Sequence, residues 1–252
     1  MNKLLITSIG RTGTVSITEF LNQLPGVKAF HERRRLDVPF LFLSQNTNYS
    51  NLTDAYLRQR DAEIQKENCE VYAEVNPYFR FVDEGLAKEL GWKKVMFSRH
   101  PKTYLESVYL RKLYRDVDIL LDQLPDNDDP YSEQWYDLSR FEKLCWYYAK
   151  VARYMLASEA RIYKFEELIK GGDALKTLVS DLGIEVPENT VYQLPKRNSS
   201  GGFSLKKIVK NVLVGKEFEP VPLDWSKLSA KEMDTYNTLC AEPAKQLGYV
   251  LQ

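Results

Sequence analysis

Short apolar runs alternate with amphipathic segments along most of the chain. The runs of strand length cover residues 3–9, 27–30, 71–75, 94–98 and 161–165. The segments between them have helical spacing and cover residues 14–23, 53–67, 80–90, 102–114 and 139–157. Buried strands separated by helices are typical of a parallel sheet covered on both faces. We therefore predict an α/β fold with a central parallel sheet flanked by helices, and 252 residues fit a single domain.

Helix boundaries and loops have their own local signals. Ser139 and Ser229 are each followed three residues later by glutamate, which is capping-box spacing and predicts a helix start at both places. Gly91 and Gly183 are predicted helix ends. Two regions interrupt the alternation: an acidic segment at 115–137, and a segment at 185–225 rich in Pro, Gly and Ser. We predict a loop for each within the single domain 1–252, and a lid-like role for the second.

The charge balance and the cysteines narrow the class of protein. The sequence has 35 basic and 35 acidic residues, so no global field favours nucleic acid or an anionic membrane, and any anion site is local. The first apolar run is too short for a signal peptide, and no run reaches the length of a membrane span. Three widely spaced cysteines, Cys69, Cys145 and Cys240, fit incidental thiols in a reducing compartment. We expect a soluble cytoplasmic protein.

The segment Gly10-Arg11-Thr12-Gly13-Thr14 follows the first strand and precedes a helix. A glycine-containing turn at this place presents backbone N–H groups at the positive end of a helix dipole, which suits a phosphate-like anion. The arginine adds a planar set of donors and a full charge, and the two threonines add hydroxyls. The alternative is a helix-capping turn with a surface arginine.

Two known kinds of phosphate loop fit this segment poorly. The nucleotide-binding pattern G-x-x-x-x-G-K-[ST] requires a lysine after the second glycine, and Thr14-Val15-Ser16 stands there instead. A cysteine phosphatase needs its nucleophile six residues before the arginine, and Leu5 occupies that position.

A second candidate anion site lies at the end of another strand. Arg99 follows the apolar run 94–98, Pro101 is suited to start the next helix, and Ser107 lies eight residues beyond the arginine. In open α/β sheets, ligands bind at the carboxyl ends of the strands. Arg99 and Ser107 are therefore expected on the same sheet edge as Arg11, where they offer a guanidinium and a hydroxyl to a second phosphate.

With these two motifs in this order, the sequence resembles the sulfotransferases that use 3′-phosphoadenosine 5′-phosphosulfate (PAPS). The resemblance implies a P-loop-like sulfotransferase architecture. It also implies that the first loop holds the 5′-phosphosulfate through Arg11, Thr12, Gly13 and Thr14, continuing into Val15 and Ser16, and that Arg99 with Ser107 holds the 3′-phosphate. After transfer, 3′,5′-adenosine diphosphate (PAP) is the product. The family's chemistry requires no metal, and we expect none.

Three weaker likenesses extend the resemblance along the chain. The segment YKFEEL at 163–168 matches a family segment that follows a late strand, with Phe165 where tyrosine is usual, and implies a ring against the adenine. The segment KRNSSGG at 196–202 lies where the family has a basic loop over the nucleotide, which implies contacts from Lys196, Arg197 and Ser199. The end of the chain resembles the family's terminal helix.

Sulfuryl transfer needs donors at the leaving oxygen and a base for the acceptor proton. Arg11 and the loop amides are the expected donors. His31 and Glu32 end the second strand on the ligand edge, and either could be the base: family branches favour Glu32, while histidine titrates in a useful range. The alternative for both is a structural hydrogen bond or ion pair. Glu74 and Asn76, after the third strand, could line the acceptor side or cap a turn.

The acceptor is expected to be a small molecule with a hydroxyl or amine. If acidic side chains of the 115–137 loop face inward, the expected acceptor is a cationic natural product; the alternative is a solvated loop. Aromatic side chains could stack on the acceptor or belong to the core: Trp135, Tyr136, Trp146, Tyr147 and Tyr148. Two other functions stay open, a nucleotide-dependent phosphotransferase and a non-catalytic module that binds PAP. We expect no nucleic-acid or membrane partner; the oligomeric state is not predicted.

Overall fold

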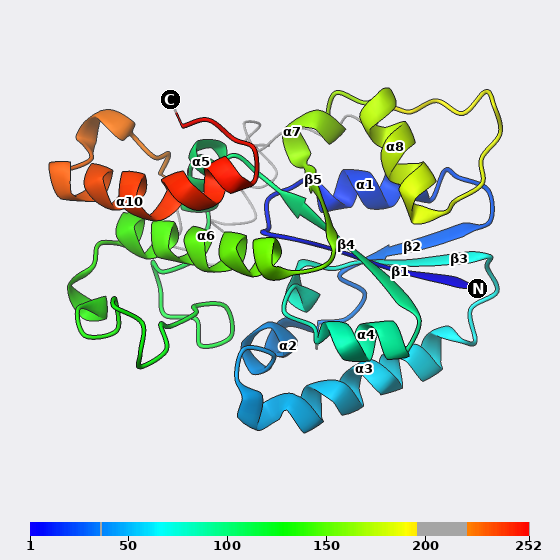
Figure 1. The fold of residues 1–252 in the computed structure, drawn as a ribbon, viewed down its shortest axis with the longest axis horizontal. Coiled ribbons are helices and arrows are strands. Elements are labelled where there is room, and N and C mark those ends of the chain that lie inside the picture. The colour runs from blue at the N-terminus through cyan, green and yellow to red at the C-terminus, as the bar shows by residue number, and fades with distance from the viewer. Residues whose placement is uncertain (36, 196–220, 252) are drawn as a thin grey trace, which may run out of the picture.

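A single parallel sheet forms the centre of the molecule (Figure 1). The computed structural model describes residues 1–35, 37–195 and 221–251. The strand order is β2-β3-β1-β4-β5, and all four strand pairs are parallel. The strands are β1 (Asn2–Ser8), β2 (Val27–His31), β3 (Val71–Val75), β4 (Trp92–Ser98) and β5 (Arg161–Lys164). The predicted α/β class with a central parallel sheet is confirmed, and each strand lies within two residues of its predicted range.

The strand order defines where a ligand can bind. From β1 the chain crosses to β2 on one side of the sheet, and from β4 it continues to β5 on the other side. The two connections diverge at the carboxyl ends of β1 and β4, which are hydrogen-bonded neighbours. In open α/β sheets this divergence leaves a crevice above the strand ends. Arg11 and Arg99 follow these two strands.

Helices cover both faces of the sheet, and β1 contributes to both cores. Leu4 and Ile6 face α1 (Thr14–Leu21) and α8 (Asp173–Leu182), whereas Leu5 faces the side of α2 (Asp37–Leu43), α3 (Ser50–Ile64) and α4 (Glu84–Glu89). This alternation follows from the two-residue period of a strand. Figure 1 shows α1 and α8 above the sheet and α3 and α4 below it.

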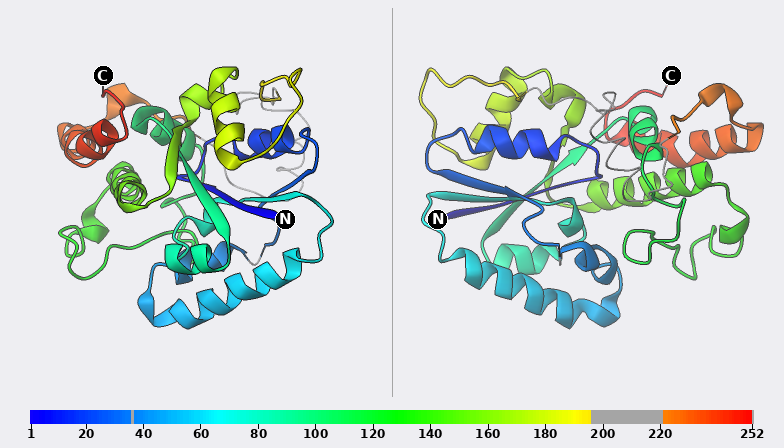
Figure 2. Two further views of the ribbon diagram at one scale, coloured as in Figure 1. Left: turned by 45° about the vertical axis from the view of Figure 1, so that its right-hand side comes forward. Right: turned by 180° about the vertical axis from the view of Figure 1, so that it is seen from behind.

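A third core lies beside β4 and β5. It is built by α5 (Pro101–Tyr109), α6 (Arg140–Ala157) and α10 (Ala230–Gln246), and α6 and α10 lie side by side in both views of Figure 2. Trp146, Tyr147 and Tyr148 are buried in this core, so the structure supports the core interpretation for them. Trp135 is also buried, and Tyr136 is exposed.

The local signals for helix ends have mixed outcomes. Both predicted capping boxes form, at Ser139 and Ser229, and Gly183 ends α8 in the left-handed conformation. The predicted helix 80–90 is too long, because Pro77–Phe79 forms a separate 3₁₀ turn and Asp83 caps α4 by accepting from the amide of Leu86. The helices α2 and α8 and the short α7 (Phe165–Leu168) were not predicted.

The first predicted loop region lies outside the regular layers. Residues 115–137 contain only one 3₁₀ turn, at Trp135–Asp137, which confirms a loop there. The second region, 185–225, is described only at its ends, and residues 196–220 lie outside the described part of the chain.

On the outer edge of β2, the side chain of Asn22 makes the backbone hydrogen bonds that a neighbouring strand would otherwise make. The amide of Asn22, just after α1, donates through Nδ2 to the carbonyl oxygen of Ala29 at 2.8 Å and accepts through Oδ1 from the amide of Ala29 at 2.8 Å. One residue thus satisfies both backbone groups of Ala29 and fixes the turn between α1 and β2.

Candidate functional site

The loop between β1 and α1 has an unusual backbone. Gly10, Arg11 and Gly13 have φ of 97°, 58° and 64°, and Arg11 is one of few non-glycine residues in the left-handed region. Among the described residues, no acceptor receives a hydrogen bond from the backbone N–H groups of residues 11–16. The hydroxyl of Thr12 is fully buried and also has no partner. The loop therefore offers a set of unsatisfied donors at the start of a helix, which is the arrangement that binds an oxyanion.

Two features require glycine at position 13: its positive φ and the nearby ring of Phe165. A Cβ added at Gly13 would lie 2.6 Å from Cε2 of Phe165, which is closer than real contacts allow. The Phe165 ring, at the start of α7, also faces the guanidinium of Arg99, whose Cζ is 5.2 Å from the ring centroid. Phe165 thus joins the two sequence motifs in space.

The two predicted anion motifs meet directly. Nη1 of Arg99 donates to the backbone carbonyl of Arg11, and Nε of Arg11 donates to Oγ of Ser107 at 3.1 Å. Helix α5 makes this possible, because it starts at Pro101, with His100 as its cap, and brings Ser107 back to the loop. The guanidinium groups of Arg11 and Arg99 therefore belong to one site.

Both arginines are partly buried and neither has a carboxylate partner. Burial, followed by the charges of Arg111 and Arg99, lowers the pKa of Arg11 to about 10. Burial also lowers the pKa of Arg99, although Glu166 and Glu106 act in the opposite direction. No ion pair links Arg11 or Arg99 to a carboxylate in the described part of the chain. Both remain charged at neutral pH, and neither charge is taken up by an ion pair in that part of the chain, so both are available to a bound anion.

The two candidate bases adjoin this loop. His31, the last residue of β2, has Nε2 2.9 Å from Oγ1 of Thr14 and 3.6 Å from Oε1 of Glu32. Glu32 has φ of 45°, and its side chain is 34% exposed, so it remains accessible to a ligand. The geometry brings both residues to the first helical turn of α1.

Glu74 and Asn76 have a structural environment instead. Both are fully buried at the end of β3. Oε2 of Glu74 accepts from the hydroxyl of Tyr72 at 2.7 Å, and Nδ2 of Asn76 donates to Asp37 at 2.8 Å. Burial raises the pKa of Glu74 above its ordinary value. The burial of both residues favours the capping alternative: Oδ1 of Asn76 accepts from the amide of Tyr78 at 3.0 Å, and its bond to Asp37 holds the segment after β2 against β3.

Sequence reasoning missed Arg80. This residue follows the 3₁₀ turn after β3 and is only 5% exposed. Its Nη1 donates to the carbonyl of Ile9 at 3.0 Å, directly before the anion loop. A lone arginine in the segment FRF carries no motif, so only the three-dimensional structure reveals it.

Several carboxylates of the acidic loop (115–137) form hydrogen bonds or ion pairs with nearby residues. Asp122 accepts from the amides of Tyr114 at 2.9 Å and Asp118 at 3.0 Å. Asp116 pairs with Lys112 at 3.4 Å on the surface. These contacts favour the solvated-loop interpretation for Asp116 and Asp122.

Three further observations concern the extent of the described residues. Lys196, Arg197 and Ser199 lie outside them. Within residues 1–35, 37–195 and 221–251, no cluster of histidine, cysteine and acidic side chains has the arrangement of a metal site. No helix in those ranges has both the length and the apolar character to cross a bilayer.

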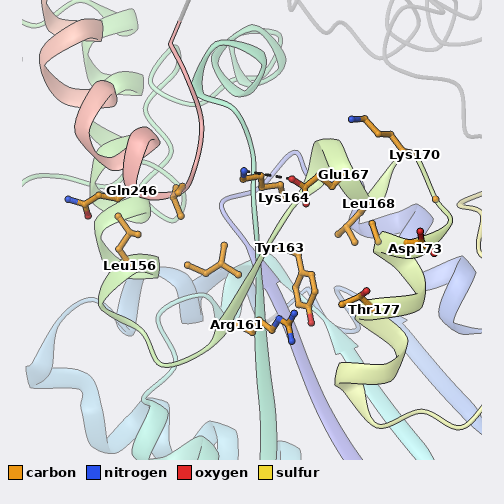
Figure 3. A pocket seen from close by; sticks show the side chains of 14 residues that line it. Leu156, Arg161, Tyr163, Lys164, Glu167, Leu168, Lys170, Asp173, Thr177 and Gln246 are labelled. Atoms are coloured by element: carbon orange, nitrogen blue, oxygen red, sulfur yellow. Dashed lines mark ion pairs between the residues drawn. The ribbon is translucent and has the colours of Figure 1, made fainter.

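A cavity of about 810 Å³ lies away from this loop, along the outer side of β5 (Figure 3). Arg161, Tyr163 and Lys164 line it from the strand, and Asp173 and Thr177 line it from α8. Lys164 pairs with Glu167 at 3.7 Å across its rim. None of the predicted site residues lines this cavity.

The comparisons with known proteins give matches among solved structures alone. No family model matches the chain, and no curated protein matches it. The chain is similar to the crystal structure of mouse sulfotransferase SULT7A1 complexed with PAP, at 14% identity and a TM-score of 0.48. The similarity covers 99% of this chain and 89% of the mouse chain.

Proposed function

We propose that the chain is a sulfotransferase that moves a sulfuryl group from PAPS to a hydroxyl or amine of a small molecule. The observation that carries this proposal is the contact between Arg99 and the backbone of Arg11, which unites two carboxylate-free guanidinium groups at one loop. A site of this kind needs a ligand with more than one negative group. PAPS has a phosphosulfate at one end of its ribose and a phosphate at the other.

The unsatisfied donors of the site fit the two ends of PAPS separately. The free amides of residues 11–16, the buried Thr12 hydroxyl and Arg11 would hold the 5′-phosphosulfate. Arg99 and Ser107 would hold the 3′-phosphate. The Phe165 ring, between Gly13 and Arg99, would pack against the base. Lys196, Arg197 and Ser199 would complete the nucleotide site from the basic loop predicted there.

The chain's own groups account for the chemistry. PAPS would supply an activated sulfuryl group: a bond forms between the acceptor atom and sulfur, the bond between sulfur and the bridging oxygen breaks, and negative charge develops on that oxygen, which leaves as part of PAP. Arg11 and the loop amides stabilise that charge, since preformed donors at a developing anion contribute most to such reactions. Glu32 or His31 removes the acceptor proton. The bond between His31 and Thr14 would keep this base beside the helix start that holds the donor.

By the same proposal the acceptor is a small molecule. The acidic side chains of the 115–137 loop are compatible with a cationic natural product as this acceptor. Asp118 is the carboxylate of that loop whose field reaches Tyr78, and the field of Glu32 reaches the same ring. An acceptor amine between these groups would be attracted to both carboxylates. A screen of hydroxyl and amine compounds, read by mass for the gain of one sulfuryl group, tests this part.

Ligand-dependent melting of the purified full chain tests the donor. A ligand that binds the native state raises the melting temperature by mass action. PAP should raise it without Mg²⁺, and ATP with Mg²⁺ should not. A rise with ATP and Mg²⁺ alone would instead support a phosphotransferase, and tight binding of PAP with no turnover on any acceptor would support a non-catalytic module. The absence of any rise with PAP would refute the proposal.

A further inference from the structure

Two arginines are almost completely buried, and their surroundings differ in charge. Arg60 is 2% exposed and lies between two carboxylates: it forms ion pairs with Asp37 and, at 3.7 Å, with Glu74. Arg80 is 5% exposed and forms no ion pair with a carboxylate in the described ranges. A buried charge without a counter-charge is costly, so Arg80 requires an explanation that Arg60 does not.

Neutral acceptors satisfy only part of the Arg80 guanidinium. Nε donates to the carbonyl of Pro77 at 2.8 Å, and Nη1 donates to the carbonyl of Ile9 at 3.0 Å and to the hydroxyl of Tyr147 at 2.8 Å. Nη2 donates to no described residue. These contacts hold the side chain in one orientation, and they leave its positive charge unbalanced and one terminal nitrogen free.

The free nitrogen lies beneath the anion loop. A Cβ added at Gly10 would lie 3.6 Å from Nη2 of Arg80. Gly10 has no side chain, so it leaves this nitrogen uncovered at the point where the backbone turns from β1 into the loop.

We infer that Arg80 is an anion-binding residue of this site, whose charge is neutralised by a tetrahedral oxyanion, sulfate or phosphate, bound at the Gly10 side of the loop. Nη2 contributes a charge-assisted hydrogen bond, and the bond from Nη1 to Ile9 positions the loop. The identity of the anion as the phosphosulfate of PAPS rests on the proposed function. The presence of an oxyanion beside Arg80 does not.

Two substitutions separate charge from shape. Arg80→Lys keeps a cation, and Arg80→Gln keeps a hydrogen-bond donor without charge. Dissociation constants for PAP and for inorganic pyrophosphate are measured by calorimetry at fixed salt, with Arg58→Gln as the matched neutralisation of an exposed arginine on α3, which is bound to Glu89. The lysine variant should bind each anion about tenfold more tightly than the glutamine variant. Arg58→Gln should match the wild type.

The outcomes distinguish this inference from the proposed function. Lysine and glutamine variants with affinities equal within about twofold would overturn the anion role and leave a loop-shaping role, whether or not PAP binds. Binding of pyrophosphate but not PAP, with lysine above glutamine, would retain the role of Arg80 and refute the PAPS site. A wild type that binds neither anion would refute both. Since both variants are polar and donate hydrogen bonds, a melting curve of each confirms the fold before comparison.

Discussion

Nε of Arg11 lies 3.1 Å from Oγ of Ser107, and this hydrogen bond joins two residues 96 positions apart in the chain. It connects the loop after β1 to the helix after β4 and directs a partly buried guanidinium across the crevice between these strands. The bond also occupies Nε of Arg11, so by the proposed function the terminal nitrogens would contact the ligand.

Replacement of Arg11 tests its role at the transferred group. Arg11→Ala should lower kcat by about 10²- to 10³-fold, the effect typical of losing one donor at a developing negative charge. Arg11→Lys should recover part of this loss because the charge remains. Steady-state kinetics with any acceptor found in the screen provide the measurement. A loss confined to KM would assign Arg11 to ground-state binding and contradict the transition-state role.

Arg99 should discriminate between ligands with and without a 3′-phosphate. Arg99→Ala should weaken PAP binding by about 10- to 100-fold, because it removes a charge-assisted interaction. Binding of adenosine 5′-phosphosulfate, which lacks that phosphate, should change much less. Calorimetry of both ligands is the measurement, and Arg58→Ala, an exposed arginine paired with Glu89, is the control. Equal losses for the two ligands would contradict the proposed division of phosphates.

The base can be identified by comparing two neighbouring variants. Glu32→Gln and His31→Asn should both leave PAP affinity within about threefold, and the variant that removes the base should lower turnover by about 10²- to 10⁴-fold. Glu89→Gln, on an exposed carboxylate of α4, is the matched control. If both variants retain full turnover, the base lies elsewhere.

Gly13→Ala should destabilise the fold and weaken PAP binding together. Alanine would adopt a φ of 64° and place its Cβ 2.6 Å from Phe165. The strain and the contact together should lower the free energy of unfolding by about 1–3 kcal/mol. Chemical denaturation measures the loss. The double variant Gly13→Ala, Phe165→Leu should recover part of it, and purely additive losses would show that the ring contact is not responsible.

Glu74 should give stability a pH dependence with a defined sign. Burial raises its pKa in the native state above the ordinary value of 4.5. The native state then binds more protons than the unfolded state, so stability falls as pH rises from about 4.5 through the raised pKa. Glu74→Gln should remove this fall, as measured by urea denaturation over a series of pH values that starts at about 4.5. The same slope in both proteins would show that Glu74 does not titrate in this range.

The sequence predicted what depends on local pattern. Alternating apolar runs located all five strands, and the serine–glutamate spacing at Ser139 and Ser229 located two helix starts, because capping is decided within four residues. It did not predict α2, where Pro39 and a continuous apolar stretch hide the helical period. That helix depends on Asp37, which is held by Arg60 and Asn76 from distant segments.

The same distinction between local pattern and long-range contacts applies to the site residues. Arg11 and Arg99 follow strands whose carboxyl ends must meet in a parallel sheet, so topology alone predicted their proximity. Arg80 follows β3 after a 3₁₀ turn, and its place under Gly10 depends on its hydrogen bonds to the backbone carbonyls of Pro77 and Ile9 and to the hydroxyl of Tyr147. The sequence left the roles of Glu74 and Asn76 open for the related reason that burial by a neighbouring segment leaves no local trace.

The side chain of Asn22 has a consequence for association between molecules. An unpaired strand at the border of a sheet is a template for another chain, and proteins that lack protection there aggregate edge to edge. Asn22 occupies both backbone groups of Ala29 with bonds of 2.8 Å, so an incoming strand would have to displace it before pairing with β2. A single amide thus protects this border of the sheet against the addition of foreign strands.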